Sequence, residues 1–244
     1  MSVQGGLVAY GNWLFHYRDK VFPVVMLVLF AGFTPVLFGG SLSSDRQLDA
    51  LGFGLALLGQ TYRWLVIGLA YIKRGGLNKR VHAHALVTDG LFAHVRNPLY
   101  GGNLLIIAGL LIVHHAPAVY VLGGAYFVLT YIAIVAAEEA YLREKFSDYA
   151  DYCRRVPRWW PRWSGLGATL TGMRFNWRRA VLKDSASCAM WVLTGLGILG
   201  LEAWHGGGLA ALEARAPGLL AGAGLAIGTA LFILQLKKRG VLTG

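Results

Sequence analysis

Polar and ionisable side chains flank an apolar helical hairpin in the middle of this chain. Arg96 and Tyr100 come at the start of the first apolar segment, and the adjacent carboxylates Glu138 and Glu139 follow the second. If both segments cross a bilayer as a hairpin, these four side chains meet at one mouth. A chain that only needed to sit in a membrane has no use for such a group there, because ionisable residues at membrane depth are costly. The pattern predicts a binding or catalytic site for a charged ligand.

The apolar segments around these residues predict an all-α integral membrane helical bundle. The chain is 56% hydrophobic and 14% charged, with a mean hydropathy of +0.51, whereas soluble domains carry about a quarter charged residues. A spanning helix needs about 20 apolar residues. We therefore expect about six transmembrane helices, at residues 21–40, 48–72, 99–113, 117–137, 187–204 and 217–236.

We expect a single membrane domain with three parts. N-terminal helices occupy residues 1–83, the motif-bearing core occupies 84–161, and an interfacial segment with two C-terminal helices occupies 162–244. The third span is short for a full crossing and is expected to form half of a tight hairpin.

The net charge of +11 is distributed unevenly along the chain. Basic residues precede the first span, fill the loops at 73–96 and 138–184, and follow the last span, whereas the other loops hold only Arg46 and Arg215. The positive-inside rule places both termini and the site on the cytoplasmic side, in a bacterial inner membrane. Because the charges flank apolar spans, we expect membrane lipids as partners rather than nucleic acid. The sequence does not indicate the oligomeric state.

Local signals predict the segments that join the spans. We expect residues 1–20 to form an interfacial lead-in, 41–49 a loop, 138–155 a helical continuation of the fourth span, and the Trp- and Arg-rich stretch 158–179 a belt at the membrane surface. That belt, as an alternative, contacts substrate directly.

Several isolated residues have more than one interpretation. Arg63, inside the second span, is either functional or close enough to the end of the span for its side chain to reach water. His114 and His115, in the turn of the hairpin, are expected to be interfacial. Cys153 and Cys188 make neither a disulfide framework nor a zinc site.

Ordered motifs in residues 84–157 carry a family resemblance. H-A-L-V-T-D-G-L-F occupies 84–92 and R-N-P-L-Y occupies 96–100. After the hairpin come the Glu-Glu pair, Phe146, the tyrosines Tyr149 and Tyr152, and R-V-P at 155–157. Each motif alone is weak, but the ordered set resembles the isoprenylcysteine carboxyl methyltransferases and phospholipid methyltransferases, which are membrane-embedded enzymes.

The resemblance implies S-adenosylmethionine as the cofactor. An arginine or histidine suits its carboxylate, a carboxylate suits its ammonium or ribose hydroxyls, and aromatic rings suit its sulfonium. By the family pattern, the cofactor-binding residues are His84, Leu86, Val87, Phe92, Asn97, Tyr100 and Glu138. Arg96, Tyr100 and Glu139 are the catalytic candidates. His82 and His84 have no third ligand nearby, so we expect no metal at this site.

The chain departs from the family pattern at three positions. Asn97 stands where the family usually has histidine, and Phe92 replaces a tyrosine. Ile134 stands where the prenylcysteine enzymes carry the arginine that binds the substrate carboxylate. The last departure argues against a prenylcysteine carboxylate as substrate and leaves the cofactor half of the motif intact.

The resulting hypothesis is methyl transfer to a lipophilic or amphipathic acceptor at the cytoplasmic membrane face. An amine lipid, a thiol and a carboxylate all remain open as acceptors. Two alternatives stand beside it: a membrane reductase with an architecture like that of the sterol reductases, and a non-enzymatic scaffold or transporter. Arg96 also has a simpler interpretation, as a positive-inside anchor, and so does the glutamate pair, as a solvated helix end.

Overall fold

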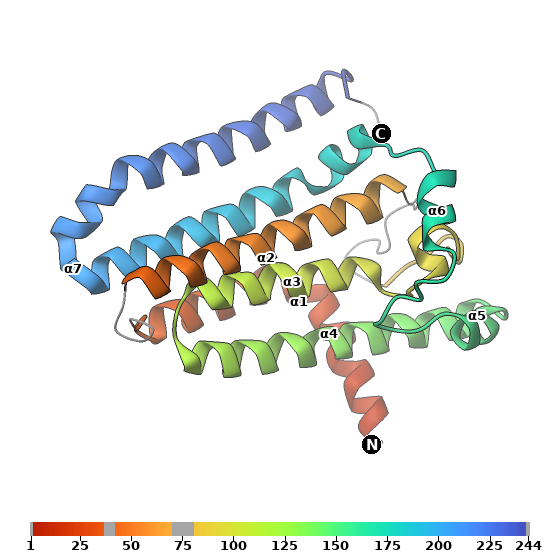
Figure 1. Ribbon diagram of the computed structural model, residues 1–244. Helices are drawn as coiled ribbons and strands as arrows, with labels where there is room; N and C mark the ends of the chain where they lie inside the picture. The colour runs from red at the N-terminus through yellow and green to blue at the C-terminus, as the bar shows by residue number, and fades with distance from the viewer. Residues whose placement is uncertain (1, 37–41, 70–80, 243–244) are drawn as a thin grey trace.

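The computed structural model describes residues 2–36, 42–69 and 81–242, which form a bundle of helices (Figure 1). These residues contain no β-strand. The elements in order are α1 (Val3–Gly32), α2 (Leu42–Leu69), the 3-10 helix η2 (Gly90–Ala93), α3 (Pro98–Val113), α4 (Pro117–Lys145), α5 (Tyr149–Arg155), α6 (Leu166–Gly172) and α7 (Trp177–Lys238). The predicted all-α helical membrane bundle is confirmed.

Prolines begin both helices of the central hairpin. Pro98 opens α3 and Pro117 opens α4, where a missing N–H removes no helical hydrogen bond and the fixed φ suits the first turn. Helix α3 ends at Val113, as expected. Helix α4 runs beyond the predicted span, so Glu138 and Glu139 lie in its last two turns and remain inside the helix.

Glycines bring α2 and α3 into close contact. A Cβ at Gly59 would lie 2.6 Å from the carbonyl oxygen of Gly102, and a Cβ at Gly109 would lie 2.3 Å from that of Gly52. Neither distance is sterically possible, so these backbones pack together only because side chains are absent. Small residues serve the same purpose in other membrane bundles. The close approach fixes the start of α3, and hence Tyr100, relative to α2.

Helix α1 is one continuous helix that includes both the expected lead-in and the start of the first predicted span. The helix begins at Val3, with the Ser2 side chain accepting a hydrogen bond from the Gly5 N–H at 3.2 Å, and the interfacial position expected for residues 1–20 stays a prediction. Gly11 lets α1 approach the backbone of α4 at Ala133. The apolar core lies mainly between α1, α3 and α4. The N-terminal helix therefore contributes directly to the site end of the bundle.

The remaining boundaries differ from the sequence predictions in detail. The expected loop at 41–49 is wrong, because α2 already includes Leu42. The ends of the spans predicted at 21–40 and 48–72, and part of the basic loop at 73–96, fall outside the described residues. The predicted continuous helix at 138–155 is broken between Lys145 and Tyr149. Even so, Leu142, Phe146, Tyr149 and Cys153 still share one apolar cluster, as their spacing predicted.

Helix α7 folds back on itself, and its two arms contain the residues predicted as the two C-terminal spans. Gly207 and Gly208 leave the helical conformation, and Gly208 has φ 62°, a left-handed value that favours glycine. The arms before and after this kink run side by side in opposite directions (Figure 1). The first arm packs against α2 and α3.

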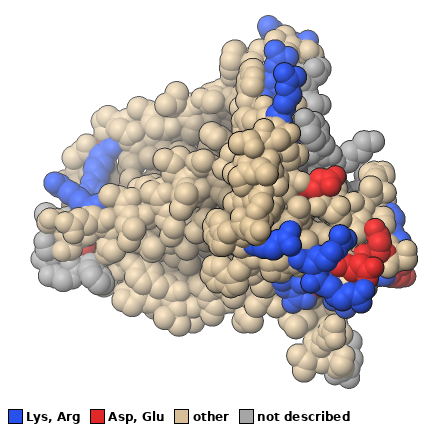
Figure 2. Space-filling model, turned by 45° about the vertical axis from the view of Figure 1, so that its right-hand side comes forward, with Lys and Arg blue, Asp and Glu red and all other residues tan. Residues whose placement is uncertain are grey.

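The surface divides into an apolar body and a charged end. Three described helices are long and apolar enough to cross a membrane, Ser43–Leu69, Pro117–Lys145 and Trp177–Lys238, and Pro98–Val113 is a shorter apolar helix. Figure 2 shows a broad tan body, with most Lys, Arg, Asp and Glu side chains gathered towards one end. The structure thus supports a membrane protein, while the count of six spans and the cytoplasmic placement of the termini stay predictions.

Candidate functional site

The predicted site residues lie at the end of the bundle that also carries η2, α5 and α6 (Figure 1). Helix α3 begins there and α4 ends there, so the hairpin does bring the R-N-P-L-Y motif next to the glutamate pair. A backbone hydrogen bond from the Arg96 N–H to the Pro157 carbonyl, at 2.9 Å, joins this motif to the R-V-P segment after α5. Motifs about sixty residues apart in the sequence therefore meet at one place.

Tyr100 and Glu138 form the first functional pair. The Tyr100 hydroxyl donates a hydrogen bond to Glu138 Oε1 at 2.6 Å, and both side chains are half-buried. The ring of Tyr100 also contacts that of Tyr131, with centroids 5.2 Å apart. This geometry holds one carboxylate oxygen in place. None of the described residues donates a hydrogen bond to the other oxygen, Oε2.

Arg18 of α1 belongs to the same group, and the sequence analysis missed it. It lies close enough to Tyr100 and Glu138 to interact electrostatically with both. The missed signal was its position: an arginine inside a helix that packs on α4 is not a simple membrane anchor. The expectation that α1 began only at residue 21 concealed this position.

Glu139 is held by arginines on its other side. Arg158 binds it with two hydrogen bonds, from Nε to Oε1 at 2.9 Å and from Nη2 to Oε2 at 2.5 Å. Arg96 Nη1 lies 3.1 Å from Oε1, and Arg143 Nη2 lies 3.8 Å from Oε2. Glu139 is only 4% exposed. Two adjacent residues of α4 thus have different surroundings, because successive side chains on a helix point about 100° apart.

Arg96 is the residue that links this ion pair to α5. Its Nη1 also donates to Cys153 Sγ at 2.7 Å, which places Cys153 in a structural contact. Its Nε is buried and has no hydrogen-bond partner among the described residues. Buried polar groups are almost always satisfied, so this N–H is a natural place for an acceptor oxygen from a ligand.

Ionisation at this end follows from the same contacts. The hydrogen bonds to Glu139 raise the pKa of Arg158, which keeps the guanidinium charged. Burial raises the pKa of the phenols of Tyr149 and Tyr152 well above the usual value. Both tyrosines therefore stay protonated near neutral pH. Tyr152 uses its hydroxyl to donate to the Phe92 carbonyl at 2.8 Å.

The other predicted cofactor residues surround these pairs in a less direct way. Asn97 donates from Nδ2 to the Arg158 carbonyl at 3.2 Å, so its side chain supports the loop after α5. Phe92 packs in a small apolar cluster with Leu69 and Leu91, and Leu86 packs against the α5 cluster. Val87 is half-buried beside Leu86 in sequence.

His84 lies on the exposed surface just before these residues. Its ring stands edge-on to that of His82, with centroids 4.7 Å apart. His82 in turn lies near the Tyr141 hydroxyl, at 3.5 Å. Of the predicted set, the structure brings Arg96, Tyr100, Glu138 and Glu139 into two ion-paired or hydrogen-bonded pairs. His84 stands apart from them.

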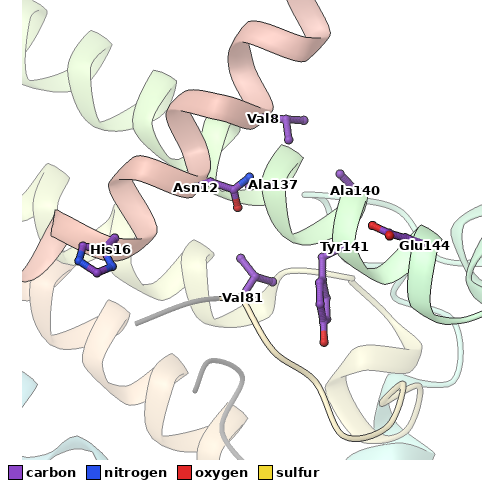
Figure 3. A pocket seen from close by; sticks show the side chains of 8 residues that line it. All are labelled: Val8, Asn12, His16, Val81, Ala137, Ala140, Tyr141 and Glu144. Carbon is purple, nitrogen blue, oxygen red and sulfur yellow. The ribbon is translucent and has the colours of Figure 1, made fainter. Parts of the chain in front are cut away.

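A cavity of about 420 Å³ opens between α1, α4 and Val81 (Figure 3). Its lining mixes apolar residues with polar side chains from α1 and α4. The lining residues are Val8, Asn12, His16, Val81, Ala137, Ala140, Tyr141 and Glu144. Ala137 directly precedes Glu138 on α4, but neither Glu138 nor Tyr100 lines the cavity. The spacing of Asn12 and His16, four residues apart on one helical face, is the signal that could have found it.

Four residues discussed in the sequence analysis are buried inside the bundle. Arg63 is buried and paired with Asp184 of α7, so its side chain does not reach the surface. Ile134 is fully buried in the apolar core. His114 and His115 are also buried, and their expected position at the membrane interface stays a prediction.

The protein is a helical membrane bundle that carries paired carboxylates, arginines and tyrosines at one end. The chain matches the phospholipid methyltransferase family over residues 50–149. This range includes Arg96, Tyr100, Glu138 and Glu139, whereas Arg18 and Arg158 lie outside it. The chain belongs to that family, a group of membrane methyltransferases. This confirms the family resemblance and favours methyl transfer over the reductase alternative.

Two curated relatives extend the similarity beyond the matched range. The cobalt-zinc-cadmium resistance protein CzcN of Cupriavidus metallidurans is 32% identical over 163 residues, which cover 64% of this chain and 69% of the relative. The nickel-cobalt-cadmium resistance protein NccN of Alcaligenes xylosoxydans xylosoxydans is 34% identical over 158 residues, covering 63% and 68% respectively. No solved structure matches the chain significantly.

Proposed function

We propose that the chain transfers a methyl group from S-adenosylmethionine to a lipophilic or amphipathic acceptor at the membrane surface. The observation that carries the proposal is the Tyr100–Glu138 pair, which holds a half-buried carboxylate at the mouth of the α3–α4 hairpin. Membership of the methyltransferase family supports the same reaction. A carboxylate in this setting binds a cationic or hydroxyl-bearing ligand well, because charged hydrogen bonds are the strong ones.

The donors and acceptors at this end suit the cofactor. The Glu138 carboxylate suits an ammonium group or ribose hydroxyls, and the unpartnered Nε of Arg96 suits a carboxylate. The tyrosine rings suit a sulfonium, through cation–π attraction. His84, Leu86, Val87, Phe92 and Asn97 complete the proposed binding residues. When bound, S-adenosylmethionine supplies an electrophilic methyl group.

Three side chains of the protein, Glu139, Tyr100 and Glu138, then have separate roles. Glu139 is held by Arg158 and Arg96. It positions the Arg96 side chain and, through it, the start of α3. We assign it a positioning role, although it was also a candidate for a catalytic one. Tyr100 orients Glu138 through its hydroxyl, and Glu138 Oε2, which has no donor among the described residues, is the oxygen that binds the ammonium or ribose hydroxyls of the cofactor. Positioning of this kind accounts for much of the barrier reduction in transfer reactions.

The cavity between α1 and α4 is the proposed route for the acceptor. Its apolar lining, Val8, Val81 and Ala137, suits an acyl or other apolar chain, and His16 and Glu144 suit a polar headgroup. Ile134 offers no charge to a substrate carboxylate, and an unpaired charge in the core is costly. We therefore propose a neutral or cationic lipid headgroup and not a prenylcysteine carboxylate.

A binding titration on the purified chain tests the cofactor. Glu138→Gln keeps the shape of the side chain but removes the charge, and a lost charged hydrogen bond costs about 1.5–3 kcal/mol. We expect the affinity for S-adenosylmethionine to fall by about tenfold or more, with the thermal unfolding temperature unchanged. Glu213→Gln, an exposed glutamate on α7, is the matched control and should bind like the wild type. Equal affinity in all three proteins would remove Glu138 from the site.

A radiolabelled methyl-transfer assay then tests the acceptor. A lipid extract and a farnesylcysteine are offered in the same detergent, and incorporation into the lipid extract alone is expected. Robust methylation of farnesylcysteine would contradict the assignment made from Ile134. The names of the two relatives leave one alternative, a membrane protein that acts in metal resistance without methyl transfer. Failure of the wild-type chain to bind S-adenosylmethionine would favour it.

A further inference from the structure

A second group of ionisable side chains lies at the end of the bundle opposite the candidate site. It joins three elements: the start of α2, the turn between α3 and α4, and α7 just before its kink, all of which lie at the same end in Figure 1. Its members are Asp45, Asp49, His115 and Glu202. The proposed methyl transfer uses none of them.

His115 occupies the centre of this group. It is only 2% exposed, and it is the one non-glycine residue in the described part of the chain with a positive φ, at 55°. Its Nε2 lies 3.2 Å from Asp49 Oδ1, and its Nδ1 lies 3.5 Å from Glu202 Oε1 and 3.9 Å from Asp45 Oδ1. The turn of the hairpin thus inserts one imidazole between carboxylates from two other helices.

The atoms that face one another here are buried and unsatisfied. Asp49 Oδ1, His115 Nε2 and Glu202 Oε1 are all inaccessible to solvent and make no well-formed hydrogen bond with any described residue. Leaving such groups unpaired is expensive, and native proteins rarely do so without a ligand, an ion or a water. The group therefore calls for a partner of positive charge.

Distance and charge identify the kind of partner. One ligand atom from each of Asp49, His115 and Glu202 lies within 4.8 Å of the other two. Ligands about 2.0–2.2 Å from a common ion are separated by at most about 4.4 Å, so small side-chain rotations close the site. Three carboxylates surround the histidine, and Arg215 is a nearby cation that interacts with Asp49 and Glu202. A dication balances the remaining negative charge.

We propose that Asp49, His115 and Glu202 bind a divalent transition-metal cation of the zinc, cobalt or nickel class. A neutral imidazole with two carboxylates is a donor set that these ions favour, whereas magnesium and calcium prefer oxygen ligands alone. Asp45 is close enough to serve as a further ligand or to orient the imidazole. The ion links α2, the α3–α4 turn and α7, so its binding stabilises the fold by mass action.

Metal titration of the full-length chain in detergent tests the site, without any reference to methyl transfer. The protein is treated with a chelator, freed of it, and titrated with Zn²⁺ by calorimetry and with Co²⁺ by absorption spectroscopy. We expect one equivalent to bind, a cobalt spectrum typical of nitrogen and oxygen ligands, and a higher unfolding temperature. Mg²⁺ at the same concentration should produce none of these changes.

Nearly isosteric variants assign the ligands. Loss of an outer-sphere partner alone weakens metal binding by about 10–100-fold, so Asp49→Asn and Glu202→Gln should each lower Zn²⁺ affinity by at least about tenfold. Glu213→Gln, farther along α7, should bind like the wild type. Both ligand variants keep their volume, so they report binding even if a substitution at His115 prevents folding.

Two outcomes overturn the proposal. The first is wild-type protein that binds no stoichiometric Zn²⁺, which would leave the cluster as a histidine held between carboxylates by charge alone. The second is binding that survives Asp49→Asn and Glu202→Gln but is lost in His82→Gln. That result would move the ion to the His82–His84 pair at the other end of the molecule.

Discussion

Two buried groups of charged residues in this bundle are built differently: the Arg63–Asp184 network in its middle and the Tyr100–Glu138 pair at its mouth. In the network, Arg63 binds both oxygens of Asp184 and also Asn103, and Gln60 donates to Asp184 Oδ2 at 2.7 Å. Trp191 donates to Gln60 at 2.9 Å and completes it. At the mouth, Glu138 is half-buried and has one hydrogen-bond donor among the described residues.

The difference separates structure from function among ionisable residues in a membrane protein. A charged group inside a membrane bundle is a candidate functional residue by default. However, the Arg63 network uses its polar atoms on other parts of the chain, so nothing is left for a ligand. Glu138 keeps an oxygen available, and Arg96 keeps an N–H. Hydrogen-bond saturation, more than burial, distinguishes the two groups.

The largest expected effect comes from breaking the saturated network. Asp184→Ala leaves the Arg63 guanidinium buried without its counter-ion, and removing one partner of a buried pair costs about 3–5 kcal/mol. We expect a strong fall in unfolding temperature and in detergent-extracted yield. Asp151→Ala is the matched control, because Asp151 is exposed and pairs with Arg154 at the surface, where such pairs contribute about 0–1 kcal/mol. Equal effects of both variants would show that the network does not hold the bundle together.

The sequence alone predicted the central hairpin well and the long-range pairs not at all. Pro98 and Pro117 mark the starts of α3 and α4 because proline suits the first turn of a helix, and the apolar runs between them are unambiguous. The start of α1 was missed because its exposed positions are polar and aromatic, which resembles an interfacial segment. No spacing rule pairs Arg63 with Asp184, since they lie 121 residues apart. Whether Arg63 and Asp184 meet and satisfy each other's hydrogen bonds depends on the packing of α2 against α7.

The site shows the same limit at finer scale. The ordered motifs indicated that residues 96–100 and 138–139 belong together, and the structure brings them together. The motifs did not indicate that Glu138 faces Tyr100 while Glu139 faces Arg158. That division depends on the rotation of α4, which the contact between Gly11 and Ala133 helps to fix.

An intermediate effect is expected at Glu139, which resembles the network although it lies at the mouth. Glu139→Gln removes the charge that Arg96 and Arg158 share, and we expect a stability loss of about 1.5–3 kcal/mol from the charged hydrogen bonds. Chemical unfolding in detergent measures it. Arg143→Gln is the control, because that side chain is 58% exposed and 3.8 Å from the carboxylate. A stable Glu139→Gln protein that fails only in methyl transfer would instead restore Glu139 as a catalytic residue.

The smallest effect on stability is expected at Tyr100, and it sharpens the comparison most. Tyr100→Phe removes only the hydroxyl that donates to Glu138 Oε1, and a water molecule at the end of the bundle can take its place. A single hydrogen bond of this kind contributes about 0.5–1.5 kcal/mol. If its role is to orient Glu138 towards the cofactor, this loss appears as a fall of about 2- to 12-fold in affinity for S-adenosylmethionine, with the unfolding temperature nearly unchanged. The reverse result, a lower unfolding temperature with unchanged affinity, would place Tyr100 and Glu138 with Arg63 and Asp184 as parts of the scaffold.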